Sequence, residues 1–162
     1  MILVTGGERS GKSSFALRLA LSRGNRRAFI ATAEPIDEDM QRRIVSHKKE
    51  RAGRFDTFEE PLDVATALKK TATYDVCVFE CVTTWLANLM YKKVNVEEAV
   101  DRFLSSLNGN EIIVTNEVGM GVVPADVETR RYVEELGRIN MRLADIADEV
   151  FFVVSGIPMR IK

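Results

Sequence analysis

Five short apolar runs alternate along the chain with longer stretches of mixed polarity. The runs occupy residues 1–5, 28–32, 76–80, 111–115 and 150–154. Continuous apolar runs of this length, separated by longer connections, are typical of strands buried in a parallel sheet. The intervening stretches predict helices over residues 12–22, 37–51, 61–71, 83–91, 95–107 and 126–147. The pattern therefore predicts the α/β class, with a mostly parallel central sheet and helices on both faces.

The composition indicates one folded domain over residues 1–162. The chain is 46% hydrophobic and 29% charged, and it has no repeat, low-complexity tract or flexible linker. Its formal net charge of -1 gives no electrostatic reason to expect a nucleic-acid or anionic-membrane partner. No apolar run approaches the roughly 20 residues that cross a bilayer. We therefore expect a cytoplasmic protein that binds small molecules.

The two cysteines, Cys77 and Cys81, lie in or just after the third predicted strand. The chain contains a single histidine, so a zinc-like cluster of cysteine and histidine cannot be assembled. We therefore expect two buried free thiols.

A glycine-rich loop follows the first predicted strand and precedes the first predicted helix. Gly6, Gly11, Lys12 and Ser13 match the pattern G-x-x-x-x-G-K-S. The glycines allow backbone N–H groups to surround a phosphate, Lys12 reaches the outer phosphates, and the Ser13 hydroxyl can bind Mg²⁺. An ordinary glycine-rich turn before a helix is the weaker alternative. The sequence thus predicts a P-loop NTPase-like domain that binds a nucleoside triphosphate.

Two further charged positions bear on this loop. Glu80 ends the third predicted strand, where P-loop proteins usually carry a carboxylate that binds Mg²⁺ directly or through water; an exposed strand end is the alternative. The positive charge of Arg9 would suit a triphosphate. A solvated side chain or an ion pair with Glu8 is an equal alternative. Mg²⁺ is therefore the expected cofactor.

The single histidine falls on one stripe of the second predicted helix. Met40, Ile44, His47 and Arg51 are spaced four, three and four residues apart, with Arg43 beside them. We therefore expect His47 to face inward between arginines, which would lower the pKa of the imidazole and keep it neutral. A neutral imidazole can attack phosphorus while arginines hold phosphate oxygens. From spacing alone, a packed or surface histidine is the alternative.

With these residues in place, the sequence closely resembles the bifunctional adenosylcobinamide kinase / adenosylcobinamide-phosphate guanylyltransferase family of cobalamin biosynthesis. The motifs that carry the resemblance span nearly the whole chain and are VTGGERSGKS, FIATAE, EDMQRRIVSHKKER, ECVTTWLANL, VTNEVGMGVVP and GRINMRLADIADEVFFVVSGIPMRIK. Several independent motifs in one order are much more specific than a P-loop alone.

The resemblance implies a two-step enzyme. It would phosphorylate the aminopropanol hydroxyl of adenosylcobinamide with ATP or GTP, and would then transfer GMP from GTP to that phosphate, giving adenosylcobinamide-GDP and pyrophosphate. In this family the guanylyl group passes through a histidine, which corresponds to His47. The resemblance therefore implies His47 and Lys12 as catalytic residues. GMP would be held as a phosphoramidate, a bond that acid breaks readily.

Nucleotide-contacting positions also carry over from the family. They fall in four groups: Gly6, Gly7, Glu8, Arg9, Ser10, Gly11, Lys12 and Ser13; Thr32, Ala33 and Glu34; Lys48, Lys49, Glu50 and Arg51; and Glu59 with Glu80. Ser13 and Glu80 would hold Mg²⁺. Glu59 is followed by Glu60, so which of the two contacts the nucleotide stays open.

The loop TNEVGMGVVP follows the fourth predicted strand and reaches the edge of the sheet where ligands collect. We interpret Asn116 and Glu117 as corrinoid or phosphate contacts, with structural turn glycines as an equal alternative. The helix over 126–147 is interpreted as core or subunit interface. The resemblance implies a homo-oligomer, with a trimer as one form. We also expect the 37–51 helix to move towards the P-loop, since a nucleophile must come within about 3 to 3.5 Å of its target.

Two other classes of function compete with this one. A P-loop nucleotide switch is disfavoured because the chain has no N-K-x-D guanine-reading motif after a strand. A plain small-molecule kinase, in which His47 is structural, differs in its products. A kinase yields a nucleoside diphosphate alone, whereas a guanylyltransferase yields pyrophosphate and a labelled histidine.

Overall fold

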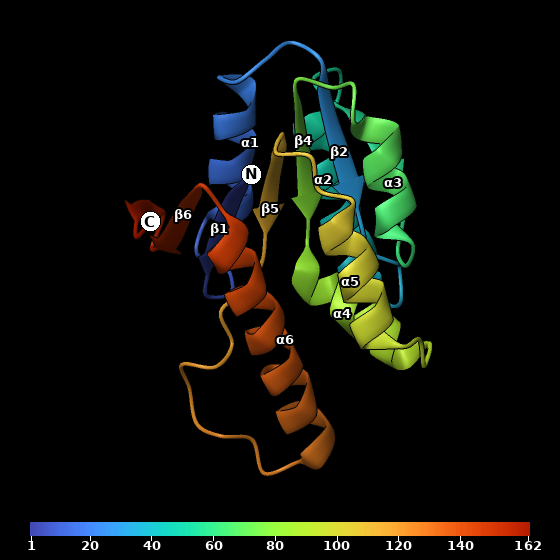
Figure 1. The fold of residues 1–162 in the computed structure, drawn as a ribbon, viewed down its shortest axis with the longest axis vertical. Helices are drawn as coiled ribbons and strands as arrows, with labels where there is room; N and C mark the ends of the chain where they lie inside the picture. Colours follow the sequence, from blue (N-terminus) through green and yellow to red (C-terminus); the bar gives the residue numbers. More distant parts are fainter.

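The computed structural model describes the backbone of residues 1–162 and all side chains except those of Asp39 and Arg43. Seven strands form one sheet in the order β3-β2-β4-β5-β1-β6-β7 (Figure 1). The strands are β1 (Ile2–Gly6), β2 (Arg27–Ala31), β3 (Asp56–Glu59), β4 (Val76–Glu80), β5 (Glu111–Val114), β6 (Glu149–Val154) and β7 (Ile157–Arg160). The helices are α1 (Lys12–Leu21), α2 (Glu38–Arg51), α3 (Val64–Thr71), α4 (Val82–Tyr91), α5 (Val96–Ser105) and α6 (Val127–Ile146). Strands β1 to β6 are parallel, which confirms the predicted α/β class, and β7 runs antiparallel to β6.

Helices cover both faces of the sheet, as predicted. On one face, α1 contributes Ala16, Leu17 and Ala20 to a cluster with side chains of the central strands. Helix α2 lies on the same face, because its Arg51 stacks on Phe29 of that cluster. The opposite face carries a larger cluster, to which α3, α4, α5 and α6 contribute. In Figure 1, α3, α5 and α6 lie in front of the sheet and α2 lies behind it.

Strand β4 shows why the predicted strands are continuously apolar. Val76 and Val78 face the α1 side, whereas Cys77 and Phe79 face the opposite cluster. All four residues are buried, so no position of the strand meets water until Glu80 at its carboxyl end. The one polar residue of this strand therefore emerges at the edge where ligands collect.

An aromatic group holds α4 and α5 against β4. The ring centroids of Phe79, Trp85 and Phe103 lie 5.0 to 6.1 Å apart in tilted or edge-to-face pairs. The indole Nε1 of Trp85 donates a hydrogen bond to Leu62 O at 2.8 Å, so the polar end of this buried ring is satisfied. The start of α4, which follows Glu80, is thereby fixed relative to the sheet.

The apolar pattern does not reveal the two edge strands, so the sheet has two more strands than predicted. Strand β3 has the sequence DTFE and is mostly exposed, and β7 has the sequence IPMR and is exposed throughout. An edge strand pairs with a neighbouring strand on one side only. Because the side chains of these two strands are largely exposed, their sequences carry no continuous apolar run. The return from β6 to β7 is a tight turn in which Ser155 and Gly156 have φ values of 51° and 82°.

All six predicted helices are present, and the clearest difference lies at α3, which begins at Val64 instead of residue 61. Glu60 Oε1 accepts hydrogen bonds from Leu62 N and Asp63 N, at 3.1 and 2.9 Å. Asp63 then caps the helix, because its Oδ1 accepts from Thr66 N at 3.4 Å and its Oδ2 accepts from the Thr66 hydroxyl at 2.7 Å. A carboxylate-stabilised turn therefore replaces the predicted first turn of helix. Within the described part of the chain, no helix is long and apolar enough to cross a membrane.

Neither cysteine forms a disulfide, as predicted, but only Cys77 is buried in full and Cys81 is half-buried. Burial raises the pKa of the Cys77 thiol to about 12. Burial of the sulfur also raises the pKa of Cys81, whose Sγ accepts a hydrogen bond from Thr84 N at 3.4 Å.

We therefore expect both thiols of the native protein to react slowly with a chromogenic disulfide reagent at mildly alkaline pH. A raised pKa keeps each thiol protonated there, and the thiolate is the reactive form. Both thiols should react at once after unfolding in guanidinium. Rapid release of one equivalent of chromophore by the native protein would contradict the buried position of the Cys81 sulfur.

Candidate active site

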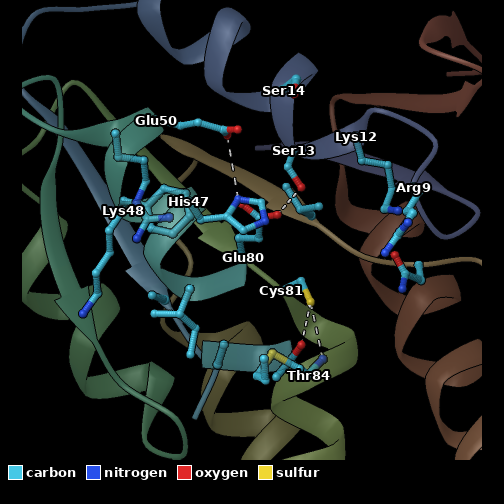
Figure 2. A pocket seen from close by; sticks show the side chains of 18 of the residues that line it. Arg9, Lys12, Ser13, Ser14, His47, Lys48, Glu50, Glu80, Cys81 and Thr84 are labelled. Atoms are coloured by element: carbon cyan, nitrogen blue, oxygen red, sulfur yellow. Dashed lines mark hydrogen bonds and ion pairs between the residues drawn. The ribbon is translucent and has the colours of Figure 1, made fainter. Parts of the chain in front are cut away.

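The carboxyl ends of five neighbouring strands meet around a cavity of about 540 Å³. The P-loop follows β1, and Asn116 follows β5. Glu59 and Glu80 end strands β3 and β4, which both pair with Ala31 of β2 from opposite sides. The inner stripe of α2 lines the same cavity, so segments distant in sequence converge on one space (Figure 2).

The P-loop starts at Gly6, a position where the backbone leaves no room for a side chain. A Cβ atom on Gly6 would lie 2.3 Å from Val153 O. At the other end, Lys12 Nζ donates to Gly7 O at 2.7 Å, so the side chain folds back across the loop. Burial lowers the pKa of Lys12, and the nearby Glu8 opposes this shift. The loop therefore holds a partly desolvated cation facing the space where phosphates bind.

Ser13 and Glu80, the two residues expected to hold Mg²⁺, are in direct contact. The Ser13 hydroxyl donates to Glu80 Oε1. Glu80 Oε2 is buried and has no hydrogen-bond partner among the described residues. A hydroxyl and a carboxylate with an unused oxygen are the hard ligands that Mg²⁺ prefers alongside nucleotide phosphates. These two residues therefore fit the metal.

Helix α2 presents the predicted stripe to the cavity. Its first turn is capped by Asp37, whose Oδ1 accepts from Met40 N at 2.7 Å. Met40, Ile44, His47 and Arg51 all line the cavity, which confirms the arrangement predicted from their spacing. The predicted neighbour Arg43 lies outside the described side chains.

His47 points into the cavity with a carboxylate beside it (Figure 2). Its side chain is 40% exposed, and His47 Nδ1 lies 3.9 Å from Glu50 Oε2 on the same helix. The contact is an ion-pair distance and too long for a hydrogen bond. The imidazole therefore faces the cavity with an acidic neighbour on its own helix.

Arg51 forms a buried cationic wall of the cavity. It is 4% exposed, and its guanidinium carbon lies 3.9 Å from the centroid of the Phe29 ring. Burial lowers the pKa of Arg51, and the carboxylates of Glu80, Glu59 and Glu50 oppose this shift. Its Nε has no hydrogen-bond partner among the described residues. A buried guanidinium with an unused donor favours an anionic ligand such as phosphate.

The structure separates the roles of Glu59 and Glu60. Glu59 lines the cavity and forms an ion pair with Lys48 Nζ at 2.5 Å. Glu60 instead stabilises the turn before α3 through its hydrogen bonds to Leu62 and Asp63. Of the two, Glu59 is therefore the residue that lines the cavity.

Most of the predicted nucleotide contacts line this cavity, and five of them do not. The lining contains Glu8, Arg9, Ser10, Gly11, Lys12, Ser13, Ala33, His47, Lys48, Glu50, Arg51, Glu59 and Glu80. Gly6 and Gly7 supply the backbone behind it. Thr32 is fully buried, and its hydroxyl bonds the main chain of Glu80 and Cys81. Glu34 lies 3.9 Å from Lys92 Nζ, and Lys49 is exposed outside the lining.

Sequence reasoning missed several lining residues. Phe29 and Pro35 border the cavity, as do Cys81 and Thr84 at the start of α4. Phe29 belongs to a strand that is apolar on both faces, so its spacing carries no sign of a ligand. Cys81 directly follows Glu80 at the ligand edge, and that position was the available signal.

Fold and site together define a class, the P-loop α/β proteins that bind nucleoside triphosphates. The crystal structure of the RadB recombinase has a similar fold, with a TM-score of 0.52 at 18% sequence identity, over 93% of this chain and 72% of that one. The chain belongs to a particular family within this class. The model of the cobinamide kinase / cobinamide phosphate guanyltransferase family matches residues 2–161.

Two relatives match over nearly their whole length. The bifunctional adenosylcobalamin biosynthesis protein CobP of Pseudomonas aeruginosa is 41% identical over 166 residues, covering 99% of this chain and 96% of the relative. The bifunctional adenosylcobalamin biosynthesis protein CobU of Salmonella typhimurium is 37% identical over 181 residues, covering 100% and 99%. The resemblance predicted from the sequence motifs is therefore confirmed.

Proposed function

We propose that the protein phosphorylates adenosylcobinamide and then transfers GMP from GTP to the new phosphate through a phosphoramidate on His47. The two activities follow from its membership of the cobinamide kinase / cobinamide phosphate guanyltransferase family. The observation that carries the histidine step is that His47, Lys12 and the Ser13–Glu80 pair line one cavity.

In the kinase step the P-loop holds the triphosphate of ATP or GTP. Backbone N–H groups of the loop and Lys12 Nζ bind phosphate oxygens, and Lys12 exchanges its bond to Gly7 O for them. Ser13 and Glu80 would hold Mg²⁺, which when bound neutralises charge on the outer phosphates. Oxygen of the acceptor hydroxyl then bonds to the γ-phosphorus and a nucleoside diphosphate leaves.

In the transferase step the free ring nitrogen of His47 attacks the α-phosphorus of GTP. A nitrogen–phosphorus bond forms, the bond to pyrophosphate breaks, and the carboxylate of Glu50 stabilises the positive charge that develops on the ring. The phosphate of adenosylcobinamide phosphate then attacks the same phosphorus, which releases His47 and forms adenosylcobinamide-GDP. Arg51 and Lys48 supply cations for the phosphate oxygens.

The remaining predicted residues receive supporting roles in the proposal. Glu59 supplies a carboxylate for donor groups of the guanine or ribose. Thr32 acts behind the site, because its hydroxyl fixes the main chain that carries Glu80. Helix α2 moves towards the P-loop when nucleotide binds, since His47 must approach the α-phosphorus to within about 3 to 3.5 Å.

We further propose a cytoplasmic homo-oligomer, with a trimer as the form to test first. Its support is the exposed apolar surface along α6 and the carboxyl-terminal edge, which includes Met141, Ile157 and Ile161. Sedimentation of the purified protein measures the number of subunits directly.

The products test the assignment of two activities. With Mg²⁺, GTP and adenosylcobinamide, we expect the corrinoid phosphate to appear first and the corrinoid-GDP later, with pyrophosphate equal to the second product. Chromatography of the corrinoids alongside a pyrophosphate assay follows both. Corrinoid phosphate with no pyrophosphate would leave only the plain kinase.

A further inference from the structure

Asn116 is held more firmly than a loop residue at the rim of a cavity requires. Its N–H donates to Thr83 Oγ1 at 2.8 Å, and its carbonyl accepts from Asn140 Nδ2 at 3.0 Å. Asn140 is itself fixed, because its Oδ1 accepts from Thr115 Oγ1 at 2.8 Å. Helices α4 and α6 thus position the backbone of Asn116 from two sides, and its side chain lines the cavity beside the P-loop.

The Asn116 side chain reaches an acidic residue of the P-loop. Its Nδ2 donates to Glu8 Oε2 at 3.3 Å, and Glu8 lines the cavity close enough to Lys12 to affect its pKa. A carboxylate beside a triphosphate repels the phosphates, so the Glu8 side chain does not favour nucleotide binding. The same carboxylate can accept the proton of a hydroxyl that attacks the γ-phosphorus.

The segment after Asn116 exposes an unusual run of apolar side chains. Met120, Val122 and Val123 are 78%, 95% and 75% exposed. The segment is anchored at the P-loop, where Glu117 N donates to Gly6 O at 3.0 Å, and it projects from the carboxyl edge of the sheet as an arc between β5 and α6 (Figure 1). Apolar residues gathered in one segment beside an active site mark a binding surface.

We propose that residues 116–123, together with the Glu8 side chain, form the subsite of the phosphoryl acceptor. This inference rests on the proposed function, in which the acceptor is a large corrinoid with a short arm ending in a hydroxyl. The macrocycle lies against Met120, Val122 and Val123, which places the arm over the P-loop. The apolar surface is continuous with the nucleotide cavity through Asn116. We therefore assign it to the acceptor, which must reach the nucleotide in that cavity.

Glu8 acts on the hydroxyl in this subsite. The hydroxyl oxygen bonds to the γ-phosphorus, the bond from that phosphorus to its bridging oxygen breaks, and the hydroxyl proton passes to the Glu8 carboxylate. The products are the corrinoid phosphate and a nucleoside diphosphate. The backbone of Glu8 remains part of the loop that surrounds the nucleotide phosphates.

The double variant Val122→Ser/Val123→Ser tests the apolar surface, with Tyr91→Ser as the matched control on an exposed position at the end of α4, outside the cavity lining. For the double variant we expect the KM for adenosylcobinamide to rise about tenfold, because apolar contact area is lost. The KM for GTP and the guanylylation of His47 without acceptor should not change. The proposal would be overturned if the double variant had an unchanged acceptor KM or equal rises in both KM values. A changed oligomeric state of the double variant with no selective rise in the acceptor KM would also overturn it.

Glu8→Gln tests the proton acceptor. We expect kcat of the kinase step to fall about 10²-fold or more, while the acceptor KM changes little. An unaltered kcat would overturn this role. If wild-type protein makes no corrinoid phosphate, the proposed function itself has failed. If the wild-type protein is active but the double variant and Glu8→Gln have the same kinetic constants as the control, the acceptor subsite is refuted and the proposed function stands.

Discussion

His47→Ala is expected to abolish guanylyl transfer while cobinamide phosphorylation continues. Without the imidazole no phosphoramidate forms, so the rate of corrinoid-GDP formation should fall by about four orders of magnitude or more. In the proposed reaction the P-loop and the Ser13–Glu80 pair hold the phosphoryl donor, and this substitution leaves both intact. Pyrophosphate release and nucleoside diphosphate formation, measured separately with adenosylcobinamide present, distinguish the two steps.

Ser46→Ala is the matched control, because Ser46 is exposed on the same turn of α2 and lies outside the cavity lining. It should retain both activities. Guanylyl transfer by His47→Ala at a rate close to that of the control would show that GMP passes directly from GTP to the corrinoid phosphate.

Lys12→Met is expected to depress both activities together, each by about 10²- to 10³-fold. In the proposed reaction the partly desolvated Lys12 cation reaches the outer phosphates, and both steps use a triphosphate held in the P-loop. Folding should survive, because this side chain donates its hydrogen bond to Gly7 O within the same loop. Rates of nucleoside diphosphate and pyrophosphate formation at saturating GTP, with thermal unfolding as the check on folding, measure the effect.

Lys70→Met is the matched control, since Lys70 is exposed in the last turn of α3 on the opposite face of the sheet. It should behave as wild type. If Lys12→Met lost only the kinase step, the two reactions would use different triphosphate sites, and the single-cavity account would be wrong.

The buried strands and the phosphate site could be predicted from the sequence, because each depends on local pattern. A strand covered on both faces, such as β4, is apolar at every position until Glu80. The P-loop requires its glycines, lysine and serine at fixed spacing, and the stripe containing His47 follows from helical periodicity alone. The edge strands β3 and β7 lack such a pattern because their side chains are exposed.

Other parts of the site depend on pairings that no local pattern carries. Of Glu59 and Glu60, the one that lines the cavity depends on the register of β3 on β2, which pairs Glu59 with Ala31. A shift of one residue would turn the other carboxylate into the cavity. The position of Asn116 likewise requires hydrogen bonds from α4 and α6, which come from distant parts of the chain.

The central claim is that His47 carries the guanylyl group, and one labelling experiment tests it most directly. The protein is incubated with Mg²⁺ and GTP labelled at the α-phosphate, without acceptor, then denatured and divided between acid and alkali before digestion with trypsin. We predict a label that is stable in alkali, lost in acid and confined to the peptide of residues 44–48, and absent from His47→Ala. No label on active wild-type protein, or a label that persists in the variant, would contradict the account.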